Sequence, residues 1–231
     1  MTIRGILFDK DGTLLNFNAT WVPINRAVAQ VVAHGDASLA AELLSAGGQD
    51  DKAGIVAPGA LLAAANTQQI AVAWAKLAPD HGFDDLVGVM DEIFQREGSN
   101  SAVPVPGLAD TISRLNDRGV ALGIATSDSR DGAMATLEPF DVLEYFDFIV
   151  GYDSGFDAKP DPAMVHGFCA ATGLTPSEVM VVGDNRHDLE MGRRAGVKIC
   201  VGVLTGTSAR EHLAELADHV VDSIADIEGM L

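Results

Sequence analysis

The sequence predicts an α/β fold, in which a doubly wound, Rossmann-like parallel sheet forms the core and an all-helical cap domain is inserted after the first strand. Two observations lead to this prediction. From about residue 104 onward, short apolar runs alternate with segments of helical length, as in a parallel sheet whose crossovers are helices. Residues 16–100, in contrast, show helical patterns only. We therefore expect a core domain formed by residues 1–15 and 101–231 and a helical cap domain formed by residues 16–100.

The predicted core strands are short apolar runs bounded by turns or helices. The first covers residues 3–8 and precedes the sequence Asp-Lys-Asp-Gly-Thr at 9–13. Five further strands are expected at 120–125, 146–150, 179–182, 198–203 and 219–221. The helices that connect and cover them are expected at 108–118, 130–138, 163–172, 188–195 and 208–217.

The cap is predicted from apolar residues that recur at helical spacing. They do so between Trp21 and Val32, with Pro23 near the start of the helix. Further cap helices are expected at 36–44, 67–77 and 84–96, and a polar, glycine-rich loop at 47–54. The insertion leaves and re-enters the core beside the first strand, which makes it a candidate lid rather than an insertion that only lengthens the fold.

The composition limits the classes of partner. The chain has 231 residues, 48% of them hydrophobic, which suffices for one sizeable core or a core with a smaller lobe. Fifteen Lys and Arg against 33 Asp and Glu give a net charge of −18. Such an acidic surface repels nucleic acid and anionic membranes, so neither is expected as a partner. A small phosphorylated metabolite would need a cation or a few basic groups at its site.

Cysteine usage and the absence of targeting signals suggest a cytoplasmic protein. Cys169 and Cys200 lie in apolar surroundings without metal-ligand spacing, so we expect buried thiols in a reducing compartment. No window has the length of a transmembrane helix, and the N-terminal residues run directly into a strand. The apolar face that bears Trp21 and Val28 could pack internally or against a second chain, so a monomer and a homodimer both stay open.

Asp9 and Asp11 follow the first strand with one residue between them. Alternate residues of an extended segment point the same way, so both carboxylates could converge at the carboxyl end of a buried strand, where open α/β sheets bind ligands. Two carboxylates this close repel and usually share a cation or a proton. The alternative is an ordinary Asp-Gly turn. By the same alternation, Lys10 should point away from both acids.

Polar residues also follow other predicted strands. Thr126 and Ser127 end one strand, Asp184 ends another, and Asp188 comes four residues later. Lys159 lies in the loop before a predicted helix. In a doubly wound sheet these positions meet at one crevice, and acids, a hydroxyl and a lysine there suit a phosphate site assisted by Mg²⁺.

Taken together, four segments resemble the haloacid dehalogenase (HAD) superfamily of phosphohydrolases. They are Asp-x-Asp-Gly-Thr at 9–13, Thr126 at a strand end, Lys159-Pro160, and Gly183-Asp184-x-x-x-Asp188. The resemblance covers essentially the whole α/β portion, and the insertion is similar to the family's helical cap. It implies a hydrolase that is phosphoglycolate phosphatase-like, requires Mg²⁺ and cleaves a small phosphorylated metabolite through an aspartyl-phosphate intermediate.

The resemblance also implies a catalytic role for three residues. Asp9 is expected to be the nucleophile that attacks phosphorus. Asp11 is expected to protonate the leaving alkoxide and then to deprotonate the water that hydrolyses the intermediate. Lys159 is expected to neutralise both the nucleophile and the phosphoryl oxygens.

The remaining motif residues are expected to hold the metal and the phosphate. Mg²⁺ would be bound by Asp9, the backbone carbonyl of Asp11, and Asp184. The Thr126 hydroxyl and the Ser127 backbone N–H would donate to the phosphate. Asp188 would orient the metal's waters or Lys159.

The residues that select the substrate are expected to lie in the cap. The best candidate is the loop at 47–54, where Lys52 could pair with a carboxylated or phosphorylated leaving group, the alternative being a solvated turn. His187 is expected to face solvent at a helix start, because Mg²⁺ prefers oxygen ligands.

The motif residues argue against some other activities of this fold and leave one of them open. Asp11 argues against a dehalogenase, which needs no general acid there, and against a phosphonatase, which usually lacks the second acid. A β-phosphoglucomutase-like phosphotransferase would share every core residue. A non-catalytic Mg²⁺-binding protein usually lacks a catalytic acid, whereas all motif positions are present here. The sequence does not identify the ester.

Overall fold

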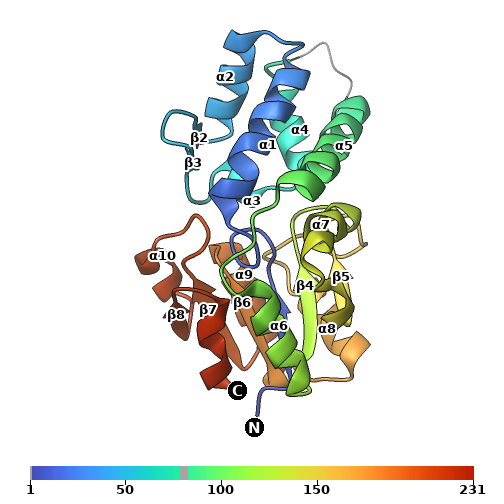
Figure 1. Ribbon diagram of the computed structural model, residues 1–231, viewed down its shortest axis with the longest axis vertical. Helices are drawn as coiled ribbons and strands as arrows, with labels where there is room; N and C mark the ends of the chain where they lie inside the picture. The colour runs from blue at the N-terminus through green and yellow to red at the C-terminus, as the bar shows by residue number, and fades with distance from the viewer. Residues whose placement is uncertain (1, 79–82) are drawn as a thin grey trace.

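A parallel sheet forms the lower half of the molecule (Figure 1), in a computed structural model that describes every residue except 1 and 79–82. The sheet has six strands in the order β5-β4-β1-β6-β7-β8, and each neighbouring pair is parallel. The strands are β1 (Gly5–Phe8), β4 (Ala121–Ala125), β5 (Phe148–Val150), β6 (Val179–Gly183), β7 (Ile199–Val203) and β8 (His219–Val221). All six lie where the apolar runs predicted them, and the doubly wound α/β prediction is confirmed.

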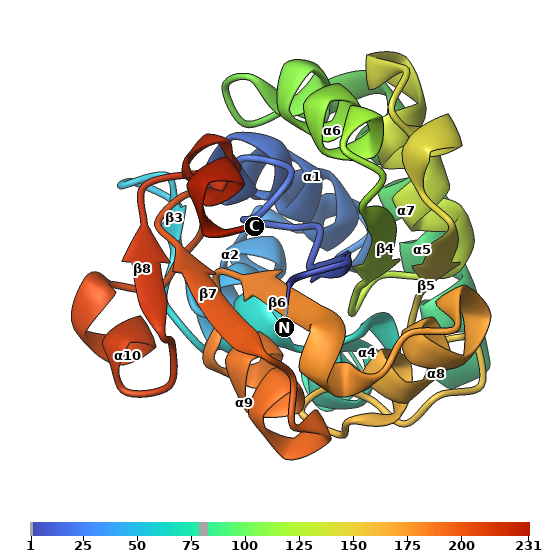
Figure 2. The ribbon, with the colours of Figure 1, turned by 90° about the horizontal axis from the view of Figure 1, so that it is seen from below.

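Helices cover both faces of the sheet, which explains why its strands are mostly apolar. Figure 2 shows α6 (Leu108–Asp117) on one side and α8 (Ala163–Thr172) and α9 (Arg186–Ala195) on the other. Adjacent residues of β1 serve opposite faces: Ile6 and Phe8 pack in the cluster with α6, whereas Leu7 packs in the cluster with α8. The remaining core helices are α7 (Arg130–Leu137), α10 (Arg210–Ala214) and the short η1 (Glu138–Phe140), η2 (Leu143–Tyr145), η3 (Pro176–Glu178) and η4 (Ile224–Met230).

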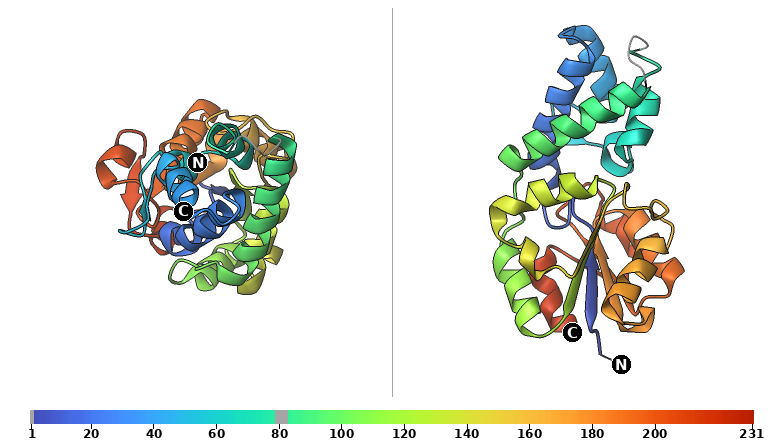
Figure 3. Two further views of the ribbon diagram at one scale, coloured as in Figure 1. Left: turned by 90° about the horizontal axis from the view of Figure 1, so that it is seen from above. Right: turned by 90° about the vertical axis from the view of Figure 1, so that its right-hand side faces the viewer.

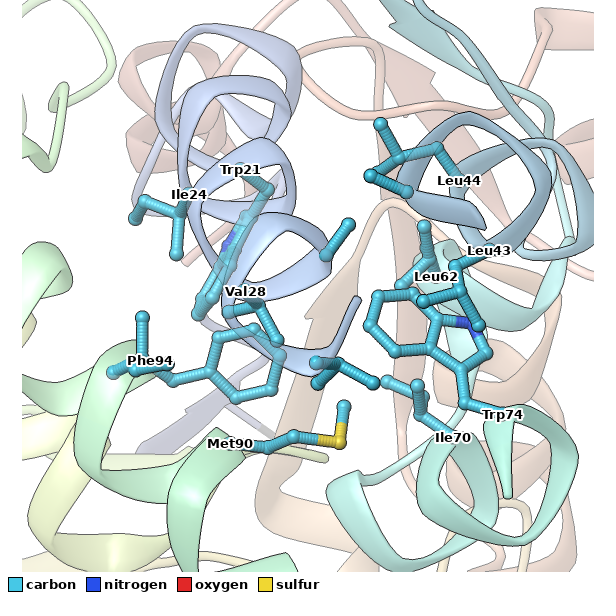
Figure 4. Close-up of a cluster of buried hydrophobic side chains, with 14 of the residues drawn as sticks. Trp21, Ile24, Val28, Leu43, Leu44, Leu62, Ile70, Trp74, Met90 and Phe94 are labelled. Carbon is cyan, nitrogen blue, oxygen red and sulfur yellow. The ribbon is translucent and has the colours of Figure 1, made fainter. Parts of the chain in front are cut away.

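The insertion lies beyond the carboxyl ends of the strands (Figure 3). Its helices are α1 (Phe17–Val32), α2 (Ala37–Ala46), α3 (Leu61–Ala64), α4 (Thr67–Trp74) and α5 (Phe83–Ser101). They enclose their own hydrophobic cluster, in which Figure 4 labels Trp21, Val28, Trp74 and Met90. Trp21 and Val28 are buried, so this apolar face packs internally.

One part of the cap differs from the all-helical prediction. Within and beside the predicted polar loop, β2 (Gln49–Asp50) and β3 (Ile55–Val56) pair as a short antiparallel hairpin. The carboxylate of Asp50 accepts hydrogen bonds from the backbone N–H groups of Lys52 and Ala53, which closes the turn. Two-residue strands are too short to leave an alternating pattern in the sequence, so this hairpin was not predicted.

Two linkers join the insertion to the core, and they run side by side. Asn16 N–H donates to the carbonyl of Val103 at 2.8 Å, and Val105 N–H donates to the carbonyl of Leu14 at 3.0 Å. We propose that this paired crossing is the boundary between the core and cap domains.

The structure also bears on the cysteines and on membrane-spanning helices. Cys169 and Cys200 are both buried, unpaired thiols, as predicted. Among the described residues, no helix combines the length and the apolar character needed to cross a bilayer.

Candidate active site

A buried lysine links the end of β1 to the start of α9. The Nζ atom of Lys159 lies 2.7 Å from Oδ1 of Asp9 and 2.6 Å from Oδ1 of Asp188, and all three side chains are less than a tenth exposed. Burial acts to lower the pKa of Lys159, but the charges of Asp188 and Asp9 outweigh it and raise that pKa above its usual value. The ammonium therefore stays charged and bridges the two carboxylates.

Three carboxylates gather beside this lysine. Oxygens of Asp9, Asp184 and Asp188 lie within 4.8 Å of one another, and all three residues are buried. Burial, and then the charges of Asp9 and Asp188, raise the pKa of Asp184 well above its usual range. A hard cation would relieve this repulsion, and an all-oxygen donor set suits Mg²⁺. The residues present therefore fit the metal that the sequence predicts.

Asp188 also begins its own helix. Its Oδ2 accepts a hydrogen bond from the Asn185 N–H at 3.0 Å, while the Asn185 side chain caps the first turn of α9. The same carboxylate thus fixes the helix start through one oxygen and contacts Lys159 through the other. The contact with Lys159 is one of the two orienting roles that the resemblance suggested for Asp188.

A loop after β7 holds Asp184 from the far side, and the sequence reasoning missed it. Thr207 N–H donates to Oδ2 of Asp184 at 3.0 Å, and the Thr205 hydroxyl donates to the carbonyl of Gly12 at 2.6 Å. Gly206 lies between these two contacts, directly against the Asp184 carboxylate. The signal in the sequence was the Thr-Gly-Thr at 205–207, which is separated by one residue from the predicted strand 198–203, at the same edge of the sheet as the other motifs.

Gly206→Ala is expected to weaken Mg²⁺ binding. An added Cβ would collide with Oδ2 of Asp184, so the loop or the carboxylate must shift. We expect the Mg²⁺ concentration that half-saturates the site to rise by about 10–100-fold, as when partners of metal ligands are lost. The control is Gly88→Ala, because no heavy atom lies within 4 Å of its added Cβ. Equal Mg²⁺ requirements in the two variants would contradict this role of the loop.

The environment of Asp11 corrects the prediction for Lys10. Lys10 does not point away: its Nζ lies 2.8 Å from Oδ1 of Asp11 and 3.0 Å from Oδ2 of Asp128, and its side chain is fully buried. Strand alternation fails here because β1 ends at Phe8, and the chain then turns, with φ of +90° at Gly12. Burial raises the pKa of Asp11 to about 6, although the charge of Lys10 acts against that rise.

The cap reaches Asp11 directly. The indole N–H of Trp21 on α1 donates to Oδ1 of Asp11 at 2.7 Å, and Lys10 lies over the same indole ring at 5.1 Å from its centroid. Sequence reasoning assigned Trp21 only to the apolar face of its helix, because a spacing pattern does not show which polar group an indole meets.

These residues open onto one cavity between sheet and cap. It contains about 660 Å³ of empty space, part of it open to solvent. All the core positions predicted for the site line it: Asp9, Asp11, Thr126, Ser127, Lys159, Asp184 and Asp188. Asp128 and His187 line it as well, so His187 is not the purely solvent-facing residue that we expected.

Lys52 corrects the prediction for the cap. It is exposed on the turn between β2 and β3 and lies beside a separate surface depression, not among the residues that line the cavity. An ion pair of 2.6 Å between Arg26 and Asp51 helps to hold this hairpin against α1. The cap instead presents residues of α1, α3, α4 and α5 to the cavity, none of which belongs to a sequence motif.

Comparisons with known proteins give the following matches. The family model of haloacid dehalogenase-like hydrolases matches residues 3–196. Pyrophosphatase PpaX of Halalkalibacterium halodurans is 27% identical over 201 residues, which cover 87% of this chain and 84% of that protein. Phosphoglycolate phosphatase of Pectobacterium atrosepticum is 27% identical over 228 residues, which cover 97% of this chain and 91% of that protein.

Solved structures share the fold at lower identity. A protein described as a predicted phosphoglycolate phosphatase from Haemophilus somnus has a TM-score of 0.75 and 22% identity, with 100% of this chain and 98% of that chain covered. CbbY of Rhodobacter sphaeroides, solved with phosphate, has a TM-score of 0.73 and 22% identity, with 98% of this chain and 97% of that chain covered.

Proposed function

Because this chain belongs to the haloacid dehalogenase-like hydrolase family, we propose that it is an Mg²⁺-dependent cytoplasmic phosphatase that hydrolyses a small phosphate monoester through an aspartyl-phosphate intermediate. One observation supports the proposal most. At the carboxyl end of β1, Asp9 is paired with Lys159 and lies within 4.8 Å of Asp184 and Asp188. This arrangement joins a nucleophile, a fixed cation and a set of metal ligands at one point.

Two proton transfers complete the proposed reaction. A bond forms between an Asp9 carboxylate oxygen and phosphorus while the phosphorus–ester oxygen bond breaks, and Asp11 gives its proton to the departing oxygen. Asp11 then removes a proton from the water that attacks the phosphorus of phosphorylated Asp9. As the water oxygen bonds to phosphorus, the bond from phosphorus to Asp9 breaks, which releases phosphate and restores the Asp9 carboxylate. The hydrogen bond from Trp21 and the contact with Lys10 fix the orientation of the Asp11 carboxylate for both transfers.

The remaining residues bind the phosphoryl group. Thr126 is nearly fully buried at the end of β4, and with Ser127 it would donate to the phosphoryl oxygens. Lys159 would offset the negative charge that develops on them. Mg²⁺, held by Asp9, Asp184 and the carbonyl of Asp11, would supply further positive charge at the same oxygens.

A panel of phosphate monoesters, assayed with and without Mg²⁺, tests this function. We expect phosphate release from at least one ester with Mg²⁺, its loss in EDTA, and its return when Mg²⁺ is added back. A hydroxylamine-sensitive phosphoprotein should form during turnover, because acyl phosphates react with hydroxylamine. If the protein binds Mg²⁺ but releases phosphate from no ester, the phosphatase proposal is wrong. If turnover requires a sugar bisphosphate primer, the protein is a phosphotransferase.

A further inference from the structure

The composition of the cavity wall bears on the leaving group of the ester. We infer that the alcohol released at this site carries no negative charge, so that the substrate is a phosphate monoester of a small, neutral and partly apolar alcohol. This inference rests on the proposed phosphatase function and narrows its substrate class. It separates this chain from phosphoglycolate and pyrophosphate chemistry, which its relatives' names suggest.

The position of the phosphoryl group decides where the alcohol must lie. Asp9, Thr126 and Lys159 are all contributed by the core, so a phosphoryl group bound among them occupies the core side of the cavity. The alcohol half of the ester therefore extends toward the cap side. The side chains that the cap presents there determine which alcohols fit.

The cap side of the cavity is a nearly continuous apolar wall. It is built from Phe17, Trp21, Leu62, Ile70 and Phe94, and from the alanines at 63–65. Figure 4 shows Trp21 and Phe94 facing each other from two helices, and their ring centroids lie 5.4 Å apart in an edge-to-face arrangement. These aromatic and aliphatic side chains also belong to the packed cluster of the cap, so their positions are fixed by neighbours rather than by a ligand.

The polar groups on this wall are neutral. Asn25 and Thr67 are buried and line the cavity, and the Asn25 amide donates to the Gln49 side chain at 3.1 Å. An amide and a hydroxyl can bind a hydroxyl or carbonyl group of a ligand, but neither offers a charge to a carboxylate.

The charges around the cavity are strongly unbalanced. Its described lining includes five carboxylates, those of Asp9, Asp11, Asp128, Asp184 and Asp188, but Lys159 is the sole lysine or arginine there. That lysine already contacts two of the five. The nearby ammonium of Lys10 is fully buried between Asp11 and Asp128, so it too is already paired.

A second anionic group on the ligand would therefore lack a partner. The carboxylate of phosphoglycolate or the second phosphate of pyrophosphate would lie against the apolar wall or near Asp11 and Asp128. A buried charge without a counter-charge is strongly disfavoured, whereas a neutral group of the same size fits this wall without such a cost. His187 is the remaining basic side chain on the described lining, so a variant of His187 belongs in the test.

A matched pair of esters tests the inference on the full-length enzyme with Mg²⁺. Phosphoglycolate and its amide, phosphoglycolamide, have the same size and differ in the charge of the leaving group. We expect kcat/KM to be at least about tenfold higher for the amide than for phosphoglycolate, because the carboxylate of phosphoglycolate would lack a partner at this wall. Pyrophosphate should be a poorer substrate than the amide. Phenyl phosphate serves as the reference ester with a neutral, apolar leaving group.

A charge-insertion variant provides a second, independent test. Ala64→Lys adds a cation to the wall, and its kcat/KM ratio should shift toward phosphoglycolate by about tenfold relative to the amide. Ala65→Lys repeats the test at a neighbouring lining position if the first variant does not fold. Ala41→Lys is the control, because it adds the same charge at an exposed cap position away from this cavity, and its ratio should match that of the wild type.

The outcomes separate this inference from the function on which it rests. Release of phosphate from phenyl phosphate, together with a preference for phosphoglycolate over its amide, would keep the phosphatase function and overturn the inference. In that case, loss of the preference in His187→Gln would identify His187 as the missing counter-charge. Release from none of the esters, in a folded protein with bound Mg²⁺, would overturn the phosphatase function as well.

Discussion

Asp9→Asn is expected to lower kcat by at least about 10⁴-fold, as in other enzymes that lose a nucleophile or its activating partner. The amide is close in size to the carboxylate, so the side chain can keep its place beside Lys159, which contacts Asp9 at 2.7 Å. It lacks the negative charge that attacks phosphorus and that binds Mg²⁺. Steady-state phosphate release measures the loss, and the hydroxylamine-sensitive phosphoprotein should be absent.

The fold should survive this substitution, because Lys159 keeps its contact with Asp188. Asp157→Asn is the matched control: it makes the same chemical change at an exposed acid in the loop before Lys159. Circular dichroism should be unchanged in both variants, and only Asp9→Asn should lose activity. A residual kcat within tenfold of the wild type would mean that another residue attacks phosphorus.

Lys159→Met is expected to affect both stability and turnover. It leaves the carboxylates of Asp9 and Asp188 buried without their shared cation. Removing one partner of a buried ion pair typically lowers the free energy of unfolding by about 3–5 kcal/mol. Loss of one group that stabilises a developing charge typically lowers kcat by about 10²–10³-fold. Urea unfolding in EDTA and phosphate release with Mg²⁺ measure the two effects separately.

The stability deficit of Lys159→Met should depend on pH. In the wild type, burial already raises the pKa of Asp188 to about 6, and the charge of Lys159 acts against that rise. Without the lysine this pKa rises further, so the ionised acid destabilises the fold at neutral pH, and protonation relieves the cost as the pH falls. The deficit in EDTA should therefore be larger at pH 8 than at pH 5.5. Lys198→Met, at an exposed lysine, should show no deficit at either pH, and a pH-independent deficit in Lys159→Met would contradict the explanation.

The parts of the fold that could be predicted from sequence are those with a local signature. A strand such as β6 is covered on both faces and must be apolar at every position, so its composition identifies it. The motif residues follow such strands, and parallel strands bring their carboxyl ends to one edge, which is why Asp9, Thr126 and Asp184 could be grouped from the sequence alone. The hairpin of β2 and β3 has no comparable signature, because each strand contributes only two residues.

The parts of the site that could not be predicted depend on tertiary contacts. The direction of Lys10 is set by the turn after β1 and by its position between Asp11 and Asp128. The apolar wall of the cavity has no motif of its own: helical spacing assigns Trp21 to an apolar face, but it does not show that Trp21 and Phe94 both pack in the cap's core and line the cavity. Lys52 illustrates the converse: a lone cation in a polar loop suggested a ligand contact, but the hairpin holds it at the surface.

The contact between Trp21 and Asp11 also gives the protein an internal optical reporter. Both tryptophans of the chain, Trp21 and Trp74, belong to the cap, so its tryptophan emission arises there. Trp74 is fully buried in the cap, whereas the indole of Trp21 is hydrogen bonded to an acid of the other domain. In a Trp74→Phe background, the emission maximum and quenching of Trp21 would report whether its indole stays against Asp11, without any added dye.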